Sequence, residues 1–402
     1  MLTHVTMQEA IAITLDQPAP HRSEEIPLAE ALDRVAAEDI YAQMDQPPFN
    51  KSPFDGYAYR TADAPGTLRV AGVHTAGVQR LTELHPGEAV QIFTGAPMPP
   101  NADAVVKQED VLRTDTSIEV SSAAKPGTNV ILRGEDVRNG ALLIPGGTRL
   151  LPAHLGELAG QGFGTVCVRQ KPRAVLLPTG SELADPGEVR LPYGIYNSSS
   201  SVLSSYLARM GLEVRRGEIV PDEEEATFRA VKAALETDAD VVFTTGGASV
   251  GDFDFAARTA RRIGAETLFW KVRMKPGGAL IVSRAGDKLL VGLSGNPAAA
   301  LMSLLVVLRP WLMKLTGADD RASWLSLPLE TDMPKTGRSV RLLRGRFAFD
   351  GGNVRFCEQE GRGNRNLASF AGCELIGAVP GGSGPLVRGD PIRALHLPPE
   401  LC

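Results

Sequence analysis

The order of apolar and polar positions divides the chain into four segments. Residues 1–41 carry apolar side chains at helical spacing, and Thr6 with Glu9 fits a capping box at the start of the first helix. Residues 42–136 change to short β-rich runs separated by turns, which predict a small β-rich domain. Residues 137–170 return to a strand and a helix, so we expect them to pair with residues 1–41 as one discontinuous linker domain.

The second half of the chain has a different pattern. Residues 171–318 alternate apolar strands with amphipathic helices, as in a doubly wound parallel sheet, and Asp222 with Glu225 fits a second capping box. Residues 319–402 are rich in glycine and short alternating runs, which predict a C-terminal β domain. The expected fold class is a multidomain α/β protein: a doubly wound α/β domain, a discontinuous α+β domain, a small β-rich domain and a C-terminal β domain.

Composition narrows the class of protein. The chain has 402 residues, with 42 Lys plus Arg against 47 Asp plus Glu, and this balance predicts no attraction to nucleic acid or to an anionic membrane. The four cysteines lie far apart, which argues against a zinc site or a disulfide framework and favours reduced thiols in the cytoplasm. The longest apolar stretch, residues 301–315, is interrupted by Arg309, Pro310 and Lys314 and predicts a buried helix.

The strongest chemical signal follows the apolar strand at residues 241–245. A loop there contains Gly246, Gly247, Ser249 and Gly251. Its glycines let backbone N–H groups turn toward a phosphate at the start of the next helix. Asp252 and Asp254 then suit Mg²⁺, which prefers one or two carboxylates plus substrate oxygens. The alternative is that one aspartate caps the helix and the glycines only turn the chain.

Basic residues follow this loop at alternate positions. Strand alternation puts Lys271, Arg273 and Lys275 on one face, with Trp270, Val272 and Met274 on the other. Such a row is either a solvated strand face or a surface for an anion. Its place after a predicted phosphate loop, within one βαβ unit, favours the anion.

Two further loops follow apolar strands of the same predicted sheet. Thr179 to Glu182 follows the first strand, and Ser294, Asn296 and Pro297 open a helix after another. Because open α/β sheets bind ligands at the carboxyl ends of their strands, we expect a shared crevice. Ser294 and Asn296 either bind the ligand or cap the helix. No His or Cys lies between Cys167 and Cys357, so this domain by itself offers no Ser-His, Cys-His or His-metal chemistry.

The segment at residues 47–60 places Asp55 beside Gly56 in a loop rich in proline and aromatic residues. Asp55 is either a site residue or part of a surface turn, since Asp-Gly is a common turn signal. Thr94 and Asp136 lie in two further polar turns of the small β-rich domain. These turns carry no functional argument by themselves.

Six of these segments, in order along the chain, resemble blocks of the molybdopterin molybdenumtransferase family, that is, the bacterial MoeA proteins and the gephyrin E-domain. The blocks are Asp55-Gly56-Tyr57-Ala58, residues 94–99, residues 179–183, residues 246–251, Lys275-Pro276-Gly277 and Gly295-Asn296-Pro297. The resemblance runs along essentially the whole chain. It implies a molybdopterin-binding α/β domain at residues 171–318 and a linker domain that takes part in dimerisation.

The resemblance implies that the enzyme inserts molybdate into adenylylated molybdopterin and releases AMP, with Mg²⁺ assisting. The family's functional acids fall on Asp55, Asp136, Glu182, Asp222 and Asp254, its lysines on Lys271 and Lys275, and its threonine on Thr94. The serine-rich block of the last domain is reduced here to Asn366-Leu367-Ala368-Ser369, which leaves Ser369 as a site candidate. A site of lysines, amides and carboxylates suits a substrate with several phosphate charges.

The resemblance also implies an elongated homodimer in which the α/β domain of one subunit and the small domains of the other form a composite site. Three positions depart from the family: Gly278 stands where a lysine is frequent, Lys51 where Asn is, and Phe54 where Met is. Two other functions stay open at this point. One is the preceding adenylyltransferase reaction, which uses a related α/β module, and the other is a non-catalytic scaffold.

Overall fold

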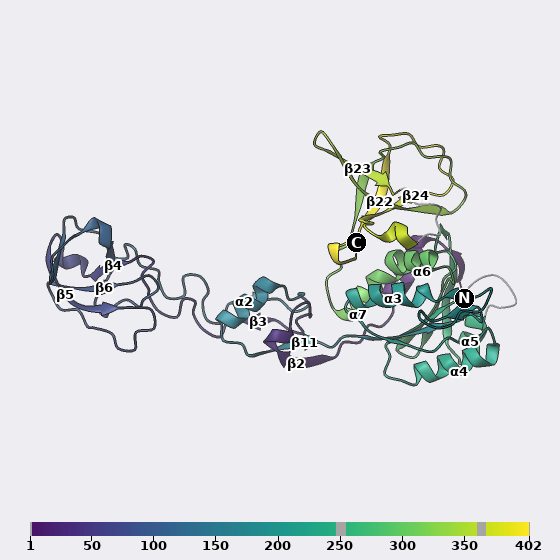
Figure 1. Cartoon of the computed structure of the whole chain (residues 1–402), viewed down its shortest axis with the longest axis horizontal. Coiled ribbons are helices and arrows are strands. Elements are labelled where there is room, and N and C mark those ends of the chain that lie inside the picture. The colour runs from purple at the N-terminus through teal and green to yellow at the C-terminus, as the bar shows by residue number, and fades with distance from the viewer. Residues whose placement is uncertain (1, 247–254, 360–366, 402) are drawn as a thin grey trace.

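The structure, a computed structural model, describes residues 2–246, 255–359 and 367–401. Figure 1 shows an elongated molecule with the small β-rich domain at one end and the α/β and C-terminal domains at the other. The linker domain lies between them (Figure 1).

The small β-rich domain is one six-stranded sheet in the order β7-β4-β6-β5-β9-β8. Its strands are β4 (Gly56–Tyr59), β5 (Gly66–His74), β6 (Glu88–Ile92), β7 (Ala104–Lys107), β8 (Leu112–Arg113) and β9 (Ser117–Val120), with 3₁₀ turns η2 (Thr61–Asp63) and η3 (Gln108–Asp110). Tyr57 and Tyr59, on the central strand β4, are 2% and 1% exposed. They pack with Leu68 and Ile118, so the aromatic residues after Asp55 anchor that loop in the core.

The linker domain is built from two strand pairs and a helix. β2 (Ser23–Pro27) pairs with β11 (Thr165–Arg169), and β3 (Ile40–Tyr41) pairs with β10 (Leu142–Ile144). A 3₁₀ turn, η1 (Leu28–Glu30), and α2 (Pro152–Gly160) complete it. The helical prediction for residues 1–41 is wrong beyond residue 15, because residues 23–27 find an antiparallel partner in β11, which lies far away in the sequence.

The α/β domain holds a seven-stranded sheet in the order β1-β17-β19-β20-β16-β12-β15. Its strands are β1 (Leu2–Val5), β12 (Arg173–Pro178), β15 (Glu213–Arg216), β16 (Val241–Thr245), β17 (Glu266–Val272), β19 (Ile281–Ala285) and β20 (Lys288–Leu293). β19 is antiparallel to both of its neighbours, and the other pairings are parallel. The expected α/β fold is therefore present, with one reversed strand in a mostly parallel sheet.

Helices cover both faces of this sheet. They are α1 (Met7–Leu15), α3 (Ser198–Arg209), α4 (Glu224–Leu235), α5 (Phe255–Arg262), α6 (Pro297–Ser303) and α7 (Arg309–Thr316). The alternation of β12 explains the two layers: Ala174 and Leu176 point into the core with α3 and α6, whereas Val175 and Leu177 pack with α4. Both faces are thus buried, as in other doubly wound sheets.

Residues 2–15 belong to the α/β domain, which corrects the predicted assignment of all of residues 1–41 to the linker domain. β1 pairs in parallel with β17, and Val5, Met7 and Ala10 pack in the core of the α/β domain. The predicted capping box is confirmed, since the Thr6 side chain accepts from the Glu9 N–H and the Glu9 carboxylate accepts from the Thr6 N–H. A local pattern identified the helix, but the partner strand lies far away in the sequence.

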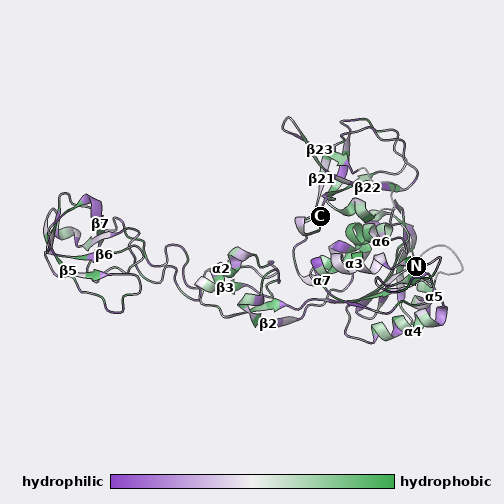
Figure 2. Cartoon of the chain, viewed as in Figure 1, coloured by the Kyte–Doolittle hydropathy of each residue, from purple (hydrophilic) through white to green (hydrophobic). Residues whose placement is uncertain are grey.

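The apolar stretch near residue 300 forms a core helix, as predicted. The helical run Pro297–Thr316 is apolar and long enough to span a membrane, yet 83% of its most apolar window is buried inside the protein. Between α6 and α7, residues Leu304–Leu308 widen into a π-helical turn just before Pro310. Proline has no N–H to donate to the preceding turn, which accounts for the irregularity there. Figure 2 shows the hydrophobic colour along α6.

The C-terminal domain is a second six-stranded sheet. It contains β18 (Met274–Lys275), β21 (Ser323–Pro328), β22 (Val340–Asp350), β23 (Asn353–Glu358), β24 (Leu375–Val379) and β25 (Pro391–His396), with 3₁₀ turns η5 (Leu367–Phe370) and η6 (Pro399–Leu401). β18 comes directly after the α/β strand β17 and pairs with β22, aligning Lys275 with Arg341. The predicted lysine segment therefore lies where the two domains join.

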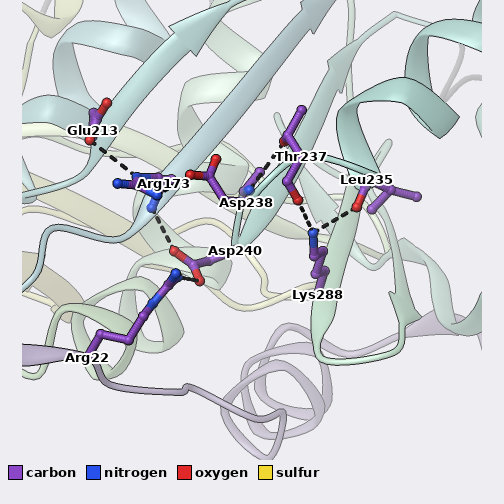
Figure 3. A network of polar contacts seen from close by, with 9 residues as sticks. Arg22, Arg173, Glu213, Leu235, Thr237, Asp238, Asp240 and Lys288 are labelled. Atoms are coloured by element: carbon purple, nitrogen blue, oxygen red, sulfur yellow. Dashed lines mark hydrogen bonds and ion pairs between the residues drawn. The ribbon is translucent and has the colours of Figure 1, made fainter.

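A polar network at the amino end of the α/β sheet ties it to the chain entering the linker domain (Figure 3). Asp240 is 8% exposed; its carboxylate accepts from the Arg22 guanidinium at 2.5 Å and from the Arg173 backbone N–H at 2.7 Å. Arg173 also pairs with Asp238, and Lys288 donates to the Leu235 and Thr237 carbonyls (Figure 3). This network lies at the opposite end of the strands from the loops considered next.

Candidate functional site

The loops after β12, β16 and β20 close on one another at the carboxyl end of the sheet. The Thr179 N–H donates to the Thr245 carbonyl at 2.9 Å, and the Gly246 N–H donates to the Leu293 carbonyl at 3.0 Å. The Thr179 hydroxyl also donates to the Thr245 carbonyl, at 2.7 Å. The loops of the predicted crevice thus contact one another although they lie far apart in sequence, and the Thr179 hydroxyl holds two of them together.

Gly246 is required at this junction. Its φ of 96° is left-handed, and a Cβ on it would lie 2.6 Å from the Thr179 hydroxyl oxygen. Gly295 packs on Gly246 less tightly, since a Cβ on Gly295 would lie 3.6 Å from Gly246 Cα, an ordinary van der Waals contact. Close backbone approach without side chains is what an anion needs to reach N–H groups.

Glu182 and Asp222 bring two carboxylates to neighbouring loops at this edge. The Asp222 Oδ2 atom accepts from the Ser181 N–H at 3.1 Å, and the Asp222 N–H donates to the Ser181 hydroxyl at 3.0 Å. The Glu182 carboxylate lies beside Gly180, where a Cβ would be 2.6 Å from Oε2. Neither carboxylate forms an ion pair with the residues that the structure describes. Both keep oxygen atoms that can take a cation or a proton.

The predicted capping box at Asp222 is wrong. Helix α4 begins at Glu224 with Glu223 at its N-cap position, and no side chain there bonds to a helix N–H. The Asp222 carboxylate is engaged by Ser181 instead. The local motif identified the right kind of side chain, but a loop distant in sequence competes for it, which moves Asp222 from a structural role toward the site.

Ser294, Asn296 and Pro297 begin helix α6. The Asn296 side chain accepts from the Ala299 N–H at 3.1 Å, which confirms the capping alternative, and Pro297 is the first helical residue. The Ser294 hydroxyl accepts from the Asn296 N–H at 3.2 Å. Both polar side chains thus shape the turn that presents Gly295.

Ser199 is a site neighbour that the motifs did not single out. Its hydroxyl donates to the Gly295 carbonyl at 3.5 Å, and it lies in the first turn of α3, whose N-cap is Asn197. The α3 N-terminus therefore joins the same strand-end region. The available signal was the run of serines after Asn197, since Asn followed by serines is typical of a helix start.

The basic row has an interrupted backbone. The continuous strand predicted across residues 269–275 is wrong, because β17 ends at Val272 and β18 pairs with the C-terminal sheet. Lys271 adopts a left-handed φ of 66°, and its Nζ lies 4.3 Å from the centre of the Trp270 ring. Arg273 and Lys275 are exposed, whereas Val272 and Met274 are buried. Arg273 and Lys275 thus reach solvent, Lys271 is held by a cation–π contact, and the binding of an anion by this row stays a prediction.

Gly278 explains one departure from the family pattern. A Cβ at this position would lie 2.5 Å from the Met274 carbonyl oxygen and 2.6 Å from that of Val272. The Gly278 carbonyl also accepts from the Val272 N–H at 3.0 Å. No side chain fits here without moving backbone, so a lysine at this position would need a different loop.

Part of the predicted site lies outside the described residues. This applies to Gly247, Ser249, Gly251, Asp252 and Asp254, which include both predicted Mg²⁺ ligands. Within the described residues, no three or more His, Cys, Asp or Glu side chains gather in one place, although Mg²⁺ needs only one or two carboxylates beside substrate oxygens.

At the far end of the molecule, Asp55 and Thr94 meet. The Asp55 Oδ1 atom accepts from the Thr94 N–H at 2.8 Å and from the Thr94 hydroxyl at 2.7 Å. The backbone N–H of Thr94, and next its hydroxyl, hold the pKa of Asp55 below its ordinary value. Lys107 places its Nζ 4.4 Å above the Phe54 ring, next to this pair. The loop therefore presents an ionised carboxylate with a cation nearby.

The other candidate site residues lie apart from one another, in the small β-rich domain, on the chain to the linker domain and in the C-terminal domain. Lys51 is joined to Ile131 through reciprocal backbone hydrogen bonds of 3.0 and 2.9 Å, which fix the base of the Asp55 loop. Asp136 is exposed on the chain leading back to the linker domain, and its N–H donates to the Gln46 carbonyl at 2.9 Å. Ser369 lies in η5 of the C-terminal domain and is only 5% exposed.

One chain thus carries two separate groups of candidates. The Asp55 and Thr94 group lies in the small β-rich domain, and the Glu182, Asp222 and Lys271 group lies on the α/β domain beyond the linker (Figure 1). A single chain in this arrangement does not bring the two groups onto one small substrate.

Comparison with known proteins connects both groups to one family. The MoeA N-terminal region (domain I and II) matches residues 5–162, and the probable molybdopterin binding domain matches residues 175–314. The chain is 33% identical to a molybdopterin molybdenumtransferase of Staphylococcus epidermidis over 354 residues, 86% of this chain and 84% of that protein. It belongs to the molybdopterin molybdenumtransferase family.

Further relatives extend the match to nearly the whole chain. A molybdopterin molybdenumtransferase of Staphylococcus aureus is 30% identical over 387 residues, 94% of this chain and 92% of that protein. A crystal structure of the molybdopterin biosynthesis MoeA protein from Pyrococcus horikoshii superposes with a TM-score of 0.86 at 28% identity, covering 98% of this chain and 99% of that one. The expected family and multidomain fold are confirmed.

Proposed function

We propose that this protein is a molybdopterin molybdenumtransferase that inserts molybdate into adenylylated molybdopterin and releases AMP, as part of molybdenum cofactor biosynthesis. The observation that carries the proposal is the group of strand-end loops that meet at Gly246, where Glu182 and Asp222 form no ion pair with a described residue, in a chain related along its length to such transferases. Backbone amides suit the phosphates of the substrate, and the lysines suit molybdate, a dianion.

Each described residue has a distinct proposed part. The Gly246 and Gly295 turns leave backbone open to phosphate oxygens, while Lys271 and Lys275 neutralise anionic charge. Glu182 and Asp222 hold or move a proton, or take a cation, at the edge of the crevice. Asp222 is oriented for this by its two hydrogen bonds with Ser181.

We propose Mg²⁺ as the assisting ion. Carboxylates are the donors that Mg²⁺ prefers, and Glu182 and Asp222 have no ion-pair partner among the described residues, so the donor set fits. Asp252 and Asp254 would add two further carboxylates. When bound, Mg²⁺ would neutralise phosphate charge at the bond that releases AMP. Binding of Mn²⁺, followed by its paramagnetic effect on water relaxation, would test this independently of activity.

We propose that the working form is a homodimer with a composite site. The separation of the Asp55 group from the α/β group within one chain supports this, because two copies can supply what one cannot (Figure 1). We further propose a cytoplasmic location, since Cys167 and Cys357, in the described part of the chain, form no disulfide.

One experiment separates this function from the adenylyltransferase step and from a scaffold role. The protein is supplied either with molybdopterin and ATP, or with adenylylated molybdopterin and molybdate, and AMP and pyrophosphate are measured. AMP release from the second mixture alone supports the proposal. Pyrophosphate release from the first mixture would indicate the adenylyltransferase, and no turnover in either would indicate a scaffold.

A further inference from the structure

A separate hollow lies where the linker domain, the α/β domain and the start of the C-terminal domain meet. Its volume is about 580 Å³, which is within the range of small-molecule sites. Five basic residues line it, together with a single acid: Arg34, Arg149, Lys171, Arg209, Arg321 and Asp33. None of these residues belongs to the strand-end crevice.

Three of the five basic side chains are not held in ion pairs within the described part of the chain. Lys171, Arg209 and Arg321 are exposed, and none of them forms an ion pair with a described residue. Arg34 is fixed in place by Glu24 and by the Arg169 carbonyl, at 2.5 and 2.8 Å. Like charges gathered on a concave wall raise the local potential and attract an anion.

The local structure explains the position of only one of the basic residues that line the hollow. Arg209 lies in the last turn of α3, where the helix dipole favours a cation. That reason does not extend to Lys171, which follows β11, or to Arg321, which precedes β21. A smaller adjoining hollow, lined by Asp319 and Asp320, shares Arg209 and Arg321, but Asp320 is already paired with Arg309. Even with Asp33 and Asp319 counted, the five basic residues of the hollow outnumber its acids.

An unpartnered donor adds an independent observation. Arg169 lines a narrow extension of the hollow, which shares Arg34 and Lys171 with it, and the Arg169 Nε atom is buried with no hydrogen-bond partner among the described residues. Gly317 lies against this side chain, and a Cβ there would be 2.8 Å from Nε. A buried donor without an acceptor is unfavourable, so this side chain adds unsatisfied positive charge beside the hollow.

We propose that this hollow binds a small molecule that carries a phosphate or pyrophosphate group. Leu32 and Leu151 line the same hollow and offer an apolar wall to the rest of the ligand. Because Arg34 and Arg149 come from the linker domain and Arg209 from the α/β domain, the bound ligand ties these two domains together. The site is distinct from the proposed active site and does not depend on it.

The test is calorimetric titration of the full-length protein with inorganic pyrophosphate and with AMP. The Arg209→Glu/Arg321→Glu variant reverses two charges of the hollow. A matched control, Arg229→Glu/Arg261→Glu, reverses two exposed arginines on α4 and α5. Lys275→Ala removes one charge of the proposed active site. Thermal unfolding of each variant establishes that it folds, and Arg209→Gln/Arg321→Gln replaces the first variant if it does not.

We expect at least one probe to bind wild-type protein, with affinity at least tenfold weaker in the Arg209/Arg321 variant and within twofold of wild type in the Arg229/Arg261 control, and we expect Lys275→Ala to retain the binding that the Arg209/Arg321 variant loses. Rising salt should weaken this binding, because it rests on charge. The proposal is overturned if neither probe binds wild type or if the Arg209/Arg321 variant binds normally. It is also overturned if Lys275→Ala abolishes all binding, which would assign the probe to the active site.

Discussion

The Oδ1 atom of Asp55 accepts two hydrogen bonds from one residue, Thr94, through its backbone N–H at 2.8 Å and its hydroxyl at 2.7 Å. Both bonds favour the ionised carboxylate, and the backbone bond is the larger cause of the lowered pKa. This pair fixes the position and the charge of the acid that the family resemblance assigns to the site.

Replacing Thr94 by valine removes the hydroxyl bond but leaves the backbone bond. We expect the pKa of Asp55 to rise in Thr94→Val while staying below 3.8, the ordinary value for an aspartate. Carboxyl ¹³C chemical shifts followed through a pH titration measure this directly. An unchanged pKa would mean that the hydroxyl does not stabilise the carboxylate.

The hydrogen bonds between Asp55 and Thr94 also determine how the protein responds to a fall in pH. The pKa of Asp55 is lower in the folded protein than in the unfolded chain. The ionised carboxylate therefore adds to the free energy of unfolding above the unfolded pKa, and this stabilisation is lost as the pH falls through the folded pKa. We expect the acid limb of the pH–rate profile to move to higher pH in Thr94→Val if protonation of Asp55 sets that limb. The Thr82→Val variant, altered elsewhere in the same domain, should leave the limb in place.

A composite site predicts complementation between two inactive variants. Asp55→Asn and Lys275→Ala homodimers should each lose at least tenfold in kcat/KM, since each damages both sites. Mixed after reversible dissociation, they should recover about a quarter of wild-type activity, because half the dimers are mixed and each contains one intact site. No recovery in a mixture shown by mass spectrometry to contain mixed dimers would place both residues in the same chain's site.

Restoring the family lysine at position 278 should harm this protein. Gly278→Lys puts a Cβ within 2.6 Å of two carbonyl oxygens, so backbone must move. We expect a loss of about 3 kcal/mol or more in the free energy of unfolding, measured by urea denaturation. Gly337→Lys is the matched control, since a Cβ there meets nothing within 4 Å. Equal stability of the two variants would contradict the close packing.

Asp240 should matter more for stability than its ionic partner Arg22. The Arg22 side chain is 47% exposed, so losing its ion pair in Arg22→Ala should cost no more than about 1 kcal/mol. Asp240→Ala also leaves the Arg173 N–H without its acceptor. We therefore expect it to lower the free energy of unfolding by about 1–3 kcal/mol more than Arg22→Ala does. Urea denaturation measures the free energy of unfolding of both variants. A larger decrease for Arg22→Ala than for Asp240→Ala would contradict this interpretation.

Local patterns predicted the elements that depend on local chemistry. The Thr6 and Glu9 capping box, the Asn296 cap and the buried helix near residue 300 are all present. These features depend on residues within a few positions of one another, where hydrogen bonding and apolar spacing decide the outcome. The same reasoning failed at Asp222, because Ser181 on another loop takes the carboxylate that the local motif assigned to a helix N–H.

The sequence by itself determined the family, the kinds of side chain in the site and the strand-end loops that carry them, because these depend on residue type and order. Only the tertiary structure decided their partners. It placed β1 beside β17, closed Gly246 against Thr179, and excluded a side chain at Gly278. It also separated Asp55 from the α/β loops by the length of the linker domain (Figure 1). Such contacts join residues far apart in the chain, where sterics and backbone hydrogen bonding leave no local signal.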